Sequence, residues 1–360
     1  MAIKLAVDAS RSVDKLQKTG VEVVSDALLK HLEATCPKSI EITYYTPEYI
    51  SWLPRDKQRL VKGRRFWTVW HLSWALFRDR PDALFVPVHN LPQWLPKINV
   101  RVIHDVSSFR TPEAYNFKER CLIRMDAWRS KWFCQKVIVP TEAVKQDLVN
   151  FIGFDRARII VTGWALDEAE IPPVLAPEPM PPRSKPYVLF VGRLEEKKNV
   201  QFLIEAFQQF KKAHPDYELL LIGKPGHGFE AIEPLLKLPG IVRLGYVSTQ
   251  EKWQLLRAAQ VLVIPSKEEG FSFPMLEAFQ VGVPVIASDI PPLLELGRDA
   301  CLFASLTDKE DFVKQLTSIA DQQVDIEMMT ERGRKRLRDF NWTTIAYKVW
   351  EALALPSQTN

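Results

Sequence analysis

The chain has 360 residues, more than one hydrophobic core usually serves, so two domains are expected. Apolar residues make up 46% and charged residues 26%, which is typical of a soluble globular protein. The four cysteines form no C-x-x-C pair, which argues against a zinc site and a disulfide framework and favours a cytoplasmic location. No apolar run reaches the roughly 18 residues of a membrane span, and the opening MAIKLAVDAS is shorter than a signal peptide.

The net charge of +4 is unevenly distributed along the chain. Residues 1–168 hold 26 Lys and Arg against 19 Asp and Glu, whereas the remaining residues hold 22 against 25. An excess of positive charge attracts anionic partners. The first half is therefore expected to meet an anionic partner.

A strand–loop–helix unit opens the chain. Residues 3–7 predict a strand, residues 8–19 a polar loop, and Gly20 begins a helix with apolar residues at helical spacing. The N–H groups and positive end of such a helix can hold an anion. Gly20 is therefore a candidate anion contact, and a plain turn glycine is the alternative reading.

Residues 55–80 combine basic and aromatic side chains. Six basic residues and one acid lie within 55–65, and Phe66, Trp67, Trp70, Trp74 and Phe77 follow. A basic segment beside an aromatic amphipathic helix is typical of a peripheral contact with an anionic membrane. The alternative is a packed helix preceded by solvated charges. No nucleic-acid-binding motif accompanies the charge, so a nucleic acid partner is not expected.

Two histidines follow predicted strands in the first half. His89 comes after the strand at 84–88, and His104-Asp105 comes after the strand at 100–103. Ligands of open α/β sheets bind outside the carboxyl ends of the strands. These residues are therefore candidate site residues, although a structural loop histidine is the alternative. The helix predicted near 118–133 has ordinary amphipathic character, and another helix follows Thr141.

A proline-rich stretch separates the two halves. Residues 171–186 contain seven prolines in 16 positions, which excludes a helix or a central strand. The sequence therefore predicts an N-terminal domain at 1–168, a linker at 169–186 and a C-terminal domain at 187–341. Residues 342–360 are expected to form a final helix that returns to the first domain.

The second half begins with a strand that ends in a glycine turn. Residues 187–191 predict the strand, Gly192 ends it, and Arg193 and Lys198 follow. At the carboxyl end of a strand, an arginine can donate two parallel hydrogen bonds to a pyrophosphate, and a lysine can place a single positive charge beside it. The next strand, at 218–222, ends in the loop GKPGHG, which is not a P-loop because no Ser or Thr follows its Lys.

The most informative stretch is 261–289, VLVIPSKEEGFSFPMLEAFQVGVPVIASD. It predicts a buried strand, a loop, a helix that tolerates Pro274 in its first turn, and a second strand. Glu269 and Glu277 are separated by seven residues. With the preceding Pro-Ser and the following GVPVIASD, this E-x7-E pattern resembles the retaining GT-B glycosyltransferases of family 4, also called group 1. The G-R-L-x-x-x-K-N run at Gly192 resembles the phosphate-binding pair of that family.

The resemblance implies an α/β fold of GT-B type, with two Rossmann-like doubly wound domains facing across a cleft. It further implies roles for the residues that match the family's motifs. Catalytic residues would be His104, Arg193, Lys198 and Glu269. Residues that bind the donor would be Gly20, Gly192, Gly223, Lys224, Gly270, Phe271, Ser272 and Glu277, and His89 and Asp105 would face the acceptor. One departure is TGWALD at 162–167, where the family usually has Asn-Gly-Val-Asp.

The reaction implied is a retaining hexosyl transfer, of mannose, glucose or a similar sugar, from a UDP- or GDP-linked donor. The acceptor would be a glycan or a lipid-linked glycan in polysaccharide biosynthesis. No cofactor and no metal are expected, and the absence of a D-x-D motif agrees with metal independence. Two alternatives stay open: a nucleotide-sugar-binding protein without transferase activity, and a GT-B-fold nucleotide-sugar epimerase. A hydrolase pairing of Glu269 and Glu277 is doubtful, because residues eight apart on a helix are about 12 Å apart along its axis.

Overall fold

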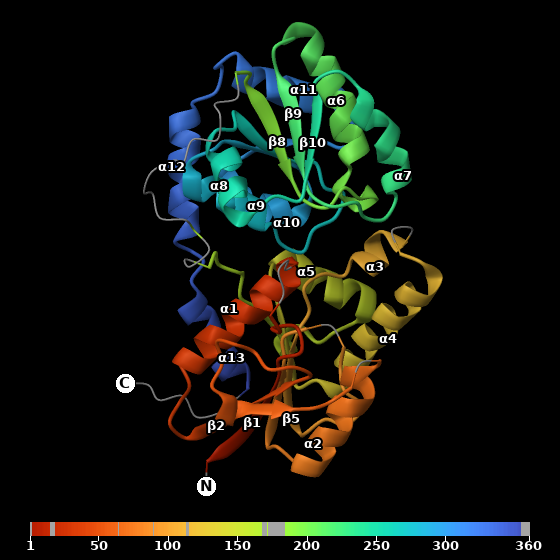
Figure 1. The fold of residues 1–360 in the computed structure, drawn as a ribbon, viewed down its shortest axis with the longest axis vertical. Coiled ribbons are helices and arrows are strands. Elements are labelled where there is room, and N and C mark those ends of the chain that lie inside the picture. Colours follow the sequence, from red (N-terminus) through yellow and green to blue (C-terminus); the bar gives the residue numbers. More distant parts are fainter. Residues whose placement is uncertain are drawn as a thin grey trace. The chain divides into compact units, whose positions relative to one another are not determined.

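The computed structural model describes residues 2–14, 19–63, 65–88, 90–112, 115–167, 171 and 184–353. The chain divides into two compact units (Figure 1). The N-terminal unit comprises Met1–Phe109, Asn116–Trp164 and Asn341–Asn360, and the C-terminal unit comprises Arg110–Tyr115 and Ala165–Phe340. The predicted linker at 169–186 lies largely outside the described residues, so its bounds and the domain limits beside it stay predictions.

Within the described residues, the N-terminal unit is built on a parallel seven-stranded sheet in the order β3-β2-β1-β4-β5-β6-β7. Its central strands are largely buried on both faces, as parallel strands covered by helices are, although β5 also buries Asn99 and Arg101. The strands are β1 (Ile3–Asp8), β2 (Ile40–Thr46), β3 (Gln58–Leu60), β4 (Ala83–Val86), β5 (Ile98–Val102), β6 (Lys136–Val139) and β7 (Ile159–Val161).

Helices follow most of these strands, and the last helix of the chain belongs to the same unit. Trp350, on that last helix, donates from Nε1 to Thr35 Oγ1 at 3.0 Å, just beyond α1. The helices are α1 (Gly20–Ala34), η1 (Arg55–Lys57), η2 (Trp67–Leu72), α2 (Ser73–Asp79), α3 (Ser107–Arg110), α4 (Phe117–Phe133), α5 (Glu142–Asp147), η4 (Leu148–Ile152), η5 (Arg156–Arg158) and α13 (Trp342–Ala352).

The C-terminal unit holds a second parallel sheet, six-stranded within the described residues, in the order β10-β9-β8-β11-β12-β13. Neighbouring residues of β8 enter different cores, since Leu189 joins one hydrophobic cluster and Val188 and Phe190 join another. Both faces of this sheet are therefore covered. The strands are β8 (Tyr187–Val191), β9 (Glu218–Ile222), β10 (Ile241–Gly245), β11 (Val261–Ile264), β12 (Val285–Ser288) and β13 (Leu302–Ala304).

Helices connect these strands on both faces of the sheet. They are η7 (Glu196–Lys198), α6 (Val200–Ala213), α7 (Phe229–Ile232), η8 (Glu233–Lys237), α8 (Thr249–Arg257), α9 (Phe273–Val281), α10 (Pro291–Gly297), η9 (Arg298–Ala300), α11 (Lys309–Ala320) and α12 (Ile326–Leu337). Two doubly wound parallel sheets confirm the predicted α/β class with two Rossmann-like domains.

Two predicted helices differ in detail from the structure. The aromatic helix expected from Phe66 is a π-helix, η2, that passes into α2, and Phe66 itself precedes it at φ 54°. The helix α4 was expected to be ordinarily amphipathic, but most of its large apolar side chains are exposed. Among the described residues, no helix is both long enough and apolar enough to cross a membrane.

Candidate functional site

The strand order of the C-terminal unit places a switch point between β8 and β11. From β8 the chain proceeds through β9 to β10, and from β11 it proceeds the other way, through β12 to β13. Doubly wound sheets bind ligands in the crevice at this point, outside the carboxyl ends of the strands. The segment after β8 carries Arg193 and Lys198, and the segment after β11 carries Glu269. The topology therefore gathers three of the predicted site residues at one edge.

Lys198 and Glu269 form an ion pair at this edge. Lys198 donates from Nζ to Glu269 Oε1, which also accepts from Ser266 Oγ at 2.8 Å. The two loops are joined through the backbone as well, since Lys267 N donates to Lys197 O at 2.8 Å. Both side chains of the pair are largely shielded from solvent. The lysine and the carboxylate are therefore held in fixed positions.

Arg193 lies apart from this pair. Its Nε is 3.7 Å from Glu195 Oε2, and 62% of its side-chain surface is exposed. The neighbouring Lys197 also pairs with Glu195, at 3.7 Å. A guanidinium with this exposure is accessible to a ligand from solvent. Its ion pair with Glu195 contributes little free energy, so an anionic ligand could replace Glu195 as the partner of Arg193.

Close backbone approach explains the glycine after β9, which packs against the turn after β8. Gly192 N donates to Ile222 O at 2.9 Å, and Gly223 N donates to Gly245 O at 2.7 Å. A Cβ on Gly223 would lie 1.7 Å from Gly192 O, and its φ of +148° also disfavours other residues. The turn therefore requires glycine. Lys224, the next residue, has its Nζ 5.0 Å from the centre of the Tyr246 ring.

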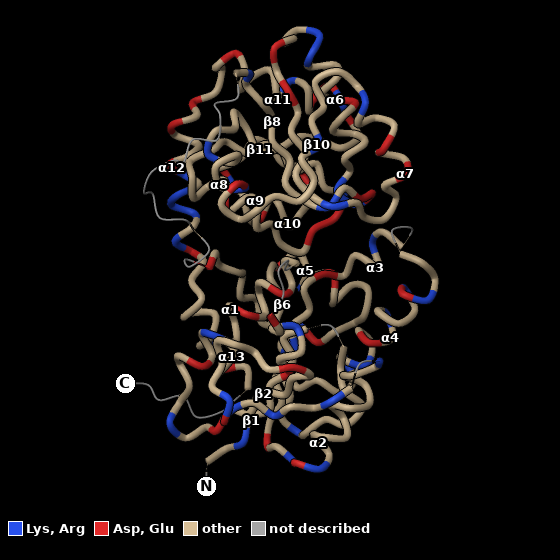
Figure 2. The backbone as a smooth tube through the Cα atoms, viewed as in Figure 1, with Lys and Arg blue, Asp and Glu red and all other residues tan. Residues whose placement is uncertain are grey.

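Glu277 is buried on α9 and pairs with a lysine that the sequence did not single out. Lys252, on α8, donates from Nζ to Glu277 Oε1 at 2.6 Å. The ion pair joins α8 to α9, helices along which Figure 2 marks both basic and acidic positions. The two residues are 25 positions apart, so no local sequence pattern indicates this pair. Lys252 thus provides an ion-pair partner for the buried side chain of Glu277.

The start of α9 holds the other predicted donor residues. Gly270 and Ser272 are buried, and Ser272 is the N-cap of α9. Phe271 is partly buried, with its ring 5.6 Å from that of Phe273 and 5.7 Å from that of Phe340. Backbone N–H groups at a helix N-terminus are donors without helical partners. This segment can thus offer backbone hydrogen bonds to a polar ligand.

The predicted site residues of the N-terminal unit lie at its own strand ends. His104 is buried, with Nε2 3.0 Å from Pro87 O and its ring 5.7 Å from that of Trp164. Asp105 accepts from Ser107 N at 3.1 Å, at the start of α3. His89 lies outside the described residues.

Gly20 is the first residue of α1, and the N-terminus of that helix is capped by a carboxylate. Glu22 Oε2 accepts from Thr19 N at 2.8 Å and from Thr19 Oγ1 at 3.1 Å. An anionic side chain therefore already occupies part of the position that was expected to attract an anion.

A buried carboxylate, not singled out from the sequence, ends β1. Asp8 accepts from Ser10 N at 2.9 Å and is fully buried, and among the described residues its Oδ2 has no hydrogen-bond partner. Burial raises the pKa of Asp8 to about 6. β1 and β4 form the switch point of the N-terminal sheet, so Asp8 lies at the corresponding edge. Within the described residues, no group of three His, Cys, Asp or Glu side chains could hold a metal ion.

Most of the C-terminal unit is similar in sequence to a known family. Residues 176–336 match the model of glycosyl transferases group 1. The sequence of this region is therefore similar to that of group 1 glycosyl transferases, the group that the sequence motifs resemble. The assignments to family 4 and to the E-x7-E motif stay predictions.

Two mannosyltransferases of Escherichia coli are similar in sequence. O-antigen chain mannosyltransferase B is 29% identical over 314 residues, which cover 82% of this chain and 81% of that protein. Serotype-specific mannosyltransferase WbdA is 23% identical over 95% of this chain. The chain spans only 43% of the length of WbdA.

Solved structures of related fold cover nearly the whole chain. Sucrose-phosphate synthase from Thermosynechococcus elongatus superimposes with a TM-score of 0.73 at 17% identity, over 97% of this chain and 98% of that one. HepE from Anabaena, solved with UDP-glucose, gives a TM-score of 0.69 at 15% identity, over 98% and 100%. These likenesses confirm the predicted GT-B fold of two Rossmann-like domains.

Proposed function

We propose that this protein is a retaining glycosyltransferase that moves a hexose from a nucleotide-diphosphate sugar to a glycan or lipid-linked acceptor. The observation that carries the proposal is the Lys198–Glu269 pair at the switch point of a sheet whose sequence matches the group 1 glycosyl transferases. A cation and a carboxylate fixed side by side suit a donor that carries a diphosphate next to a sugar.

The proposed task of Lys198 and Arg193 is to stabilise the leaving diphosphate. Cleavage of the sugar–phosphate bond transfers negative charge to the diphosphate oxygens. Cations positioned where charge develops stabilise the transition state more than the ground state. Lys198 is held by Glu269, and Arg193 is exposed and able to reorient, so the two would contribute a fixed charge and an adjustable one. We propose that these cations replace a metal ion at the diphosphate.

Glu277 is proposed to accept hydrogen bonds from the ribose hydroxyls of the donor. Its Oε1 is paired with Lys252, and a carboxylate has about four lone-pair sites. The Lys252 contact therefore leaves acceptor capacity on Glu277 for the ribose hydroxyls. Glu269, with backbone groups of Phe271 and Ser272, is proposed to hold the sugar hydroxyls, and His104 stays a predicted sugar contact.

The relatives favour mannose as the transferred sugar. O-antigen chain mannosyltransferase B and WbdA are both mannosyltransferases by name. HepE, which shares the fold, was solved with UDP-glucose. GDP-mannose and UDP-glucose are therefore the first donors to test. A surface polysaccharide or its lipid-linked precursor is the proposed acceptor.

The protein is proposed to act in the cytoplasm, at the inner face of a membrane. The basic segment 55–65 supports this location only in part, because two of its cations are engaged. Lys57 pairs with Glu33, and Arg59 pairs with Asp79 at 3.2 Å. Arg55, Lys62 and Arg65 are exposed and able to face anionic lipid headgroups.

Binding of UDP, GDP and ADP, and of their sugar conjugates, tests the proposed donor site. Calorimetry with Mg²⁺ and with a chelator is expected to show one nucleoside diphosphate bound with the same dissociation constant under both conditions. Transfer from the matching sugar donor, followed by NMR of the product, is expected to give retained anomeric configuration. Absence of binding to every nucleotide would refute the donor site, and binding without turnover on any glycan would favour a silent binding protein.

A further inference from the structure

The helix α4 has its polar side turned inward. Its buried residues are Asp126, Ala127 and Ser130. Helices on a globular surface normally bury their apolar stripe instead. Asp126 and Trp128 lie about 200° apart around the helix axis, because each residue turns the helix by 100°. The opposite, outer side is therefore the one that carries the tryptophans.

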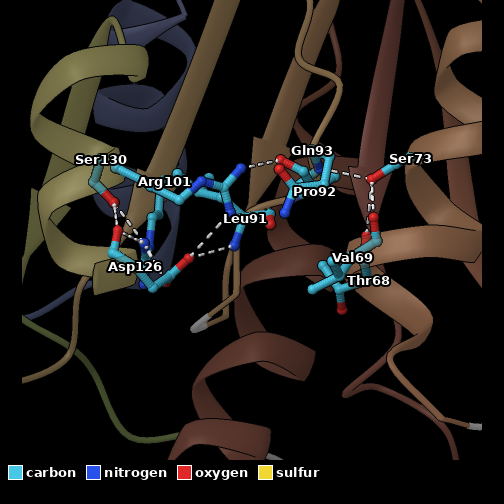
Figure 3. Close-up of polar contacts among 10 residues, drawn as sticks. Thr68, Val69, Ser73, Leu91, Pro92, Gln93, Arg101, Asp126 and Ser130 are labelled. Carbon is cyan, nitrogen blue, oxygen red and sulfur yellow. Dashed lines mark hydrogen bonds and ion pairs between the residues drawn. The ribbon is translucent and has the colours of Figure 1, made fainter. Parts of the chain in front are cut away.

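A network of polar contacts explains why the polar side faces inward (Figure 3). Asp126 accepts from Leu91 N at 3.0 Å and pairs with Arg101 of β5 at 2.6 Å. Ser130 donates to Asp126 O at 2.9 Å. Arg129 donates to Leu91 O at 3.1 Å and to Pro92 O at 2.8 Å. Turning the apolar side of α4 inward would break these contacts and leave buried charges unpaired.

The outer side of α4 is consequently rich in exposed apolar side chains. Phe117 is 71% exposed and Trp132 is 70% exposed. Met125, Trp128 and Trp132 lie at i, i+3 and i+7, a spacing that keeps them on one face of the helix. The exposed apolar residues of this helix, called here the α4 face, are Phe117, Leu122, Ile123, Met125, Trp128, Trp132 and Phe133.

A second exposed aromatic group is attached to the same loop. Gln93 N donates to Ser73 Oγ at 2.6 Å, so η2 and α2 adjoin the residues that bind α4 (Figure 3). The π-helix and α2 expose Phe66, Trp70, Trp74 and Phe77. Both groups of aromatic residues thus belong to elements fixed to residues 91–93.

Cations lie over the rings of both groups. Arg120 lies over Phe117 at 5.6 Å, and Lys131 lies over Trp128 at 5.1 Å and Trp132 at 5.3 Å. On the second group, Arg78 lies over Trp74 and Arg80 over Phe77. Acidic residues are few on α4, since it carries only Glu119 and the buried Asp126 against Lys118, Arg120, Arg124, Arg129 and Lys131.

We propose that the α4 face is a docking surface for an anionic membrane, in which the aromatic side chains enter the headgroup region and the cations meet lipid phosphates. Aromatic and aliphatic side chains on one side of a helix, flanked by lysine and arginine, bind in the plane of the interface without crossing the bilayer. The positive charge selects an anionic surface over a neutral one. The α4 face adds exposed apolar side chains to the membrane contact proposed for segment 55–65. Membrane binding by this face can be tested without measuring transferase activity.

Vesicle binding by the full chain tests the α4 face. The wild type is expected to sediment with vesicles of phosphatidylglycerol and phosphatidylethanolamine, and to bind phosphatidylcholine vesicles much more weakly. Trp128→Ser combined with Trp132→Ser is expected to lower the partition coefficient on anionic vesicles by a factor of about 10 or more, because two exposed aromatic side chains lose their apolar burial. Lys118→Glu is expected to lower it by a smaller factor. Bromine-labelled lipid acyl chains are expected to quench tryptophan fluorescence in the wild type more than in the double variant.

Matched controls come from exposed side chains outside this face. Tyr347→Ser on α13 combined with Leu294→Ser on α10 removes two exposed apolar groups, and Lys212→Glu on α6 reverses one exposed charge. These variants are expected to bind vesicles as the wild type does. Three results would overturn the proposal: no vesicle binding by the wild type, unchanged binding by the double tryptophan variant, or a stable wild-type dimer in sedimentation analysis that this variant converts to monomers. The last result would assign the α4 face to a second copy of the chain.

Discussion

Lys198 donates from Nζ to the Oε1 atom of Glu269, a residue 71 positions later in the chain. The contact forms because β8 and β11 are neighbours at the switch point of the C-terminal sheet. A second contact on the same carboxylate, from Ser266 Oγ at 2.8 Å, fixes its orientation. Lysine and carboxylate are therefore positioned before any ligand arrives, which reduces the cost of ordering them during a reaction.

Lys198→Ala is expected to lower kcat/KM for glycosyl transfer by roughly 100- to 1000-fold, the usual effect of removing one donor that stabilises transition-state charge. The loss should appear mainly in kcat, because charge on the leaving group develops in the transition state. Steady-state turnover of the donor measures it. Lys212→Ala, at an exposed position of α6, serves as the control and should leave both constants unchanged. Equal turnover by Lys198→Ala and the wild type would disprove the proposed role.

Lys252→Met is expected to lower the free energy of unfolding by about 2 kcal/mol, because it leaves Glu277 buried without its cation. The same change should weaken binding of the nucleoside diphosphate, if Glu277 holds the ribose. Urea denaturation and calorimetry measure the two effects. Lys309→Met provides a matched control, since the Lys309–Glu205 pair is more exposed and should contribute less than about 1 kcal/mol. Equal losses in the two variants would show that burial of the Lys252 pair is unimportant.

Gly223→Ala is expected to prevent the native turn after β9, because its Cβ would overlap Gly192 O at 1.7 Å. A backbone atom cannot move aside as a flexible side chain can, so a loss of more than about 4 kcal/mol is expected. Gly245→Ala is the matched control. Gly245 also has a positive φ, of 74°, but nothing lies within 4 Å of its added Cβ, so only the conformational cost of about 1–2 kcal/mol applies. Denaturation midpoints that are the same for the two variants would contradict this explanation.

Asp8→Asn is expected to stabilise the protein above pH 6 and to remove part of its pH dependence. Burial raises the pKa of Asp8 from 3.8 to about 6, so the folded state binds its proton more tightly than the unfolded state. The stability contributed by that proton is complete below pH 4 and is lost as the pH rises through about 6. The difference amounts to about 3 kcal/mol at neutral pH, at 1.36 kcal/mol for each pKa unit.

The measurement for Asp8 is the free energy of unfolding by urea at several pH values between 4 and 8. The variant should gain on the wild type as the pH rises, with little difference near pH 4. Asp82→Asn is a suitable control, because the Asp82 side chain accepts from Lys4 N at an exposed position. A parallel pH dependence in wild type and Asp8→Asn would mean that Asp8 does not titrate in this range.

Local patterns determined most of the secondary structure in the sequence. The strand at 261–264, Pro274 in the first turn of α9 and Thr141 as the N-cap of α5 follow from apolar runs and capping chemistry within a few residues. The alternation of strands and helices indicated an α/β fold, and the resemblance of the motifs to the glycosyltransferases implied two doubly wound sheets. These features depend on neighbouring residues, which is why the sequence alone determines them.

Tertiary structure decided which charges meet. Glu269 and Lys198 were both predicted at strand ends, but their contact depends on strand order, which the sequence pattern did not specify. The Lys252–Glu277 pair depends on the packing of α8 against α9 and had no local signal. The orientation of α4 was likewise set by distant groups, because Arg101 and the backbone of Leu91 satisfy Asp126 only when the tryptophans face outward. The sequence determines the local preference for a helix or a strand. Which side of a helix faces the core depends on whether the charges on that side form ion pairs and hydrogen bonds when they are buried.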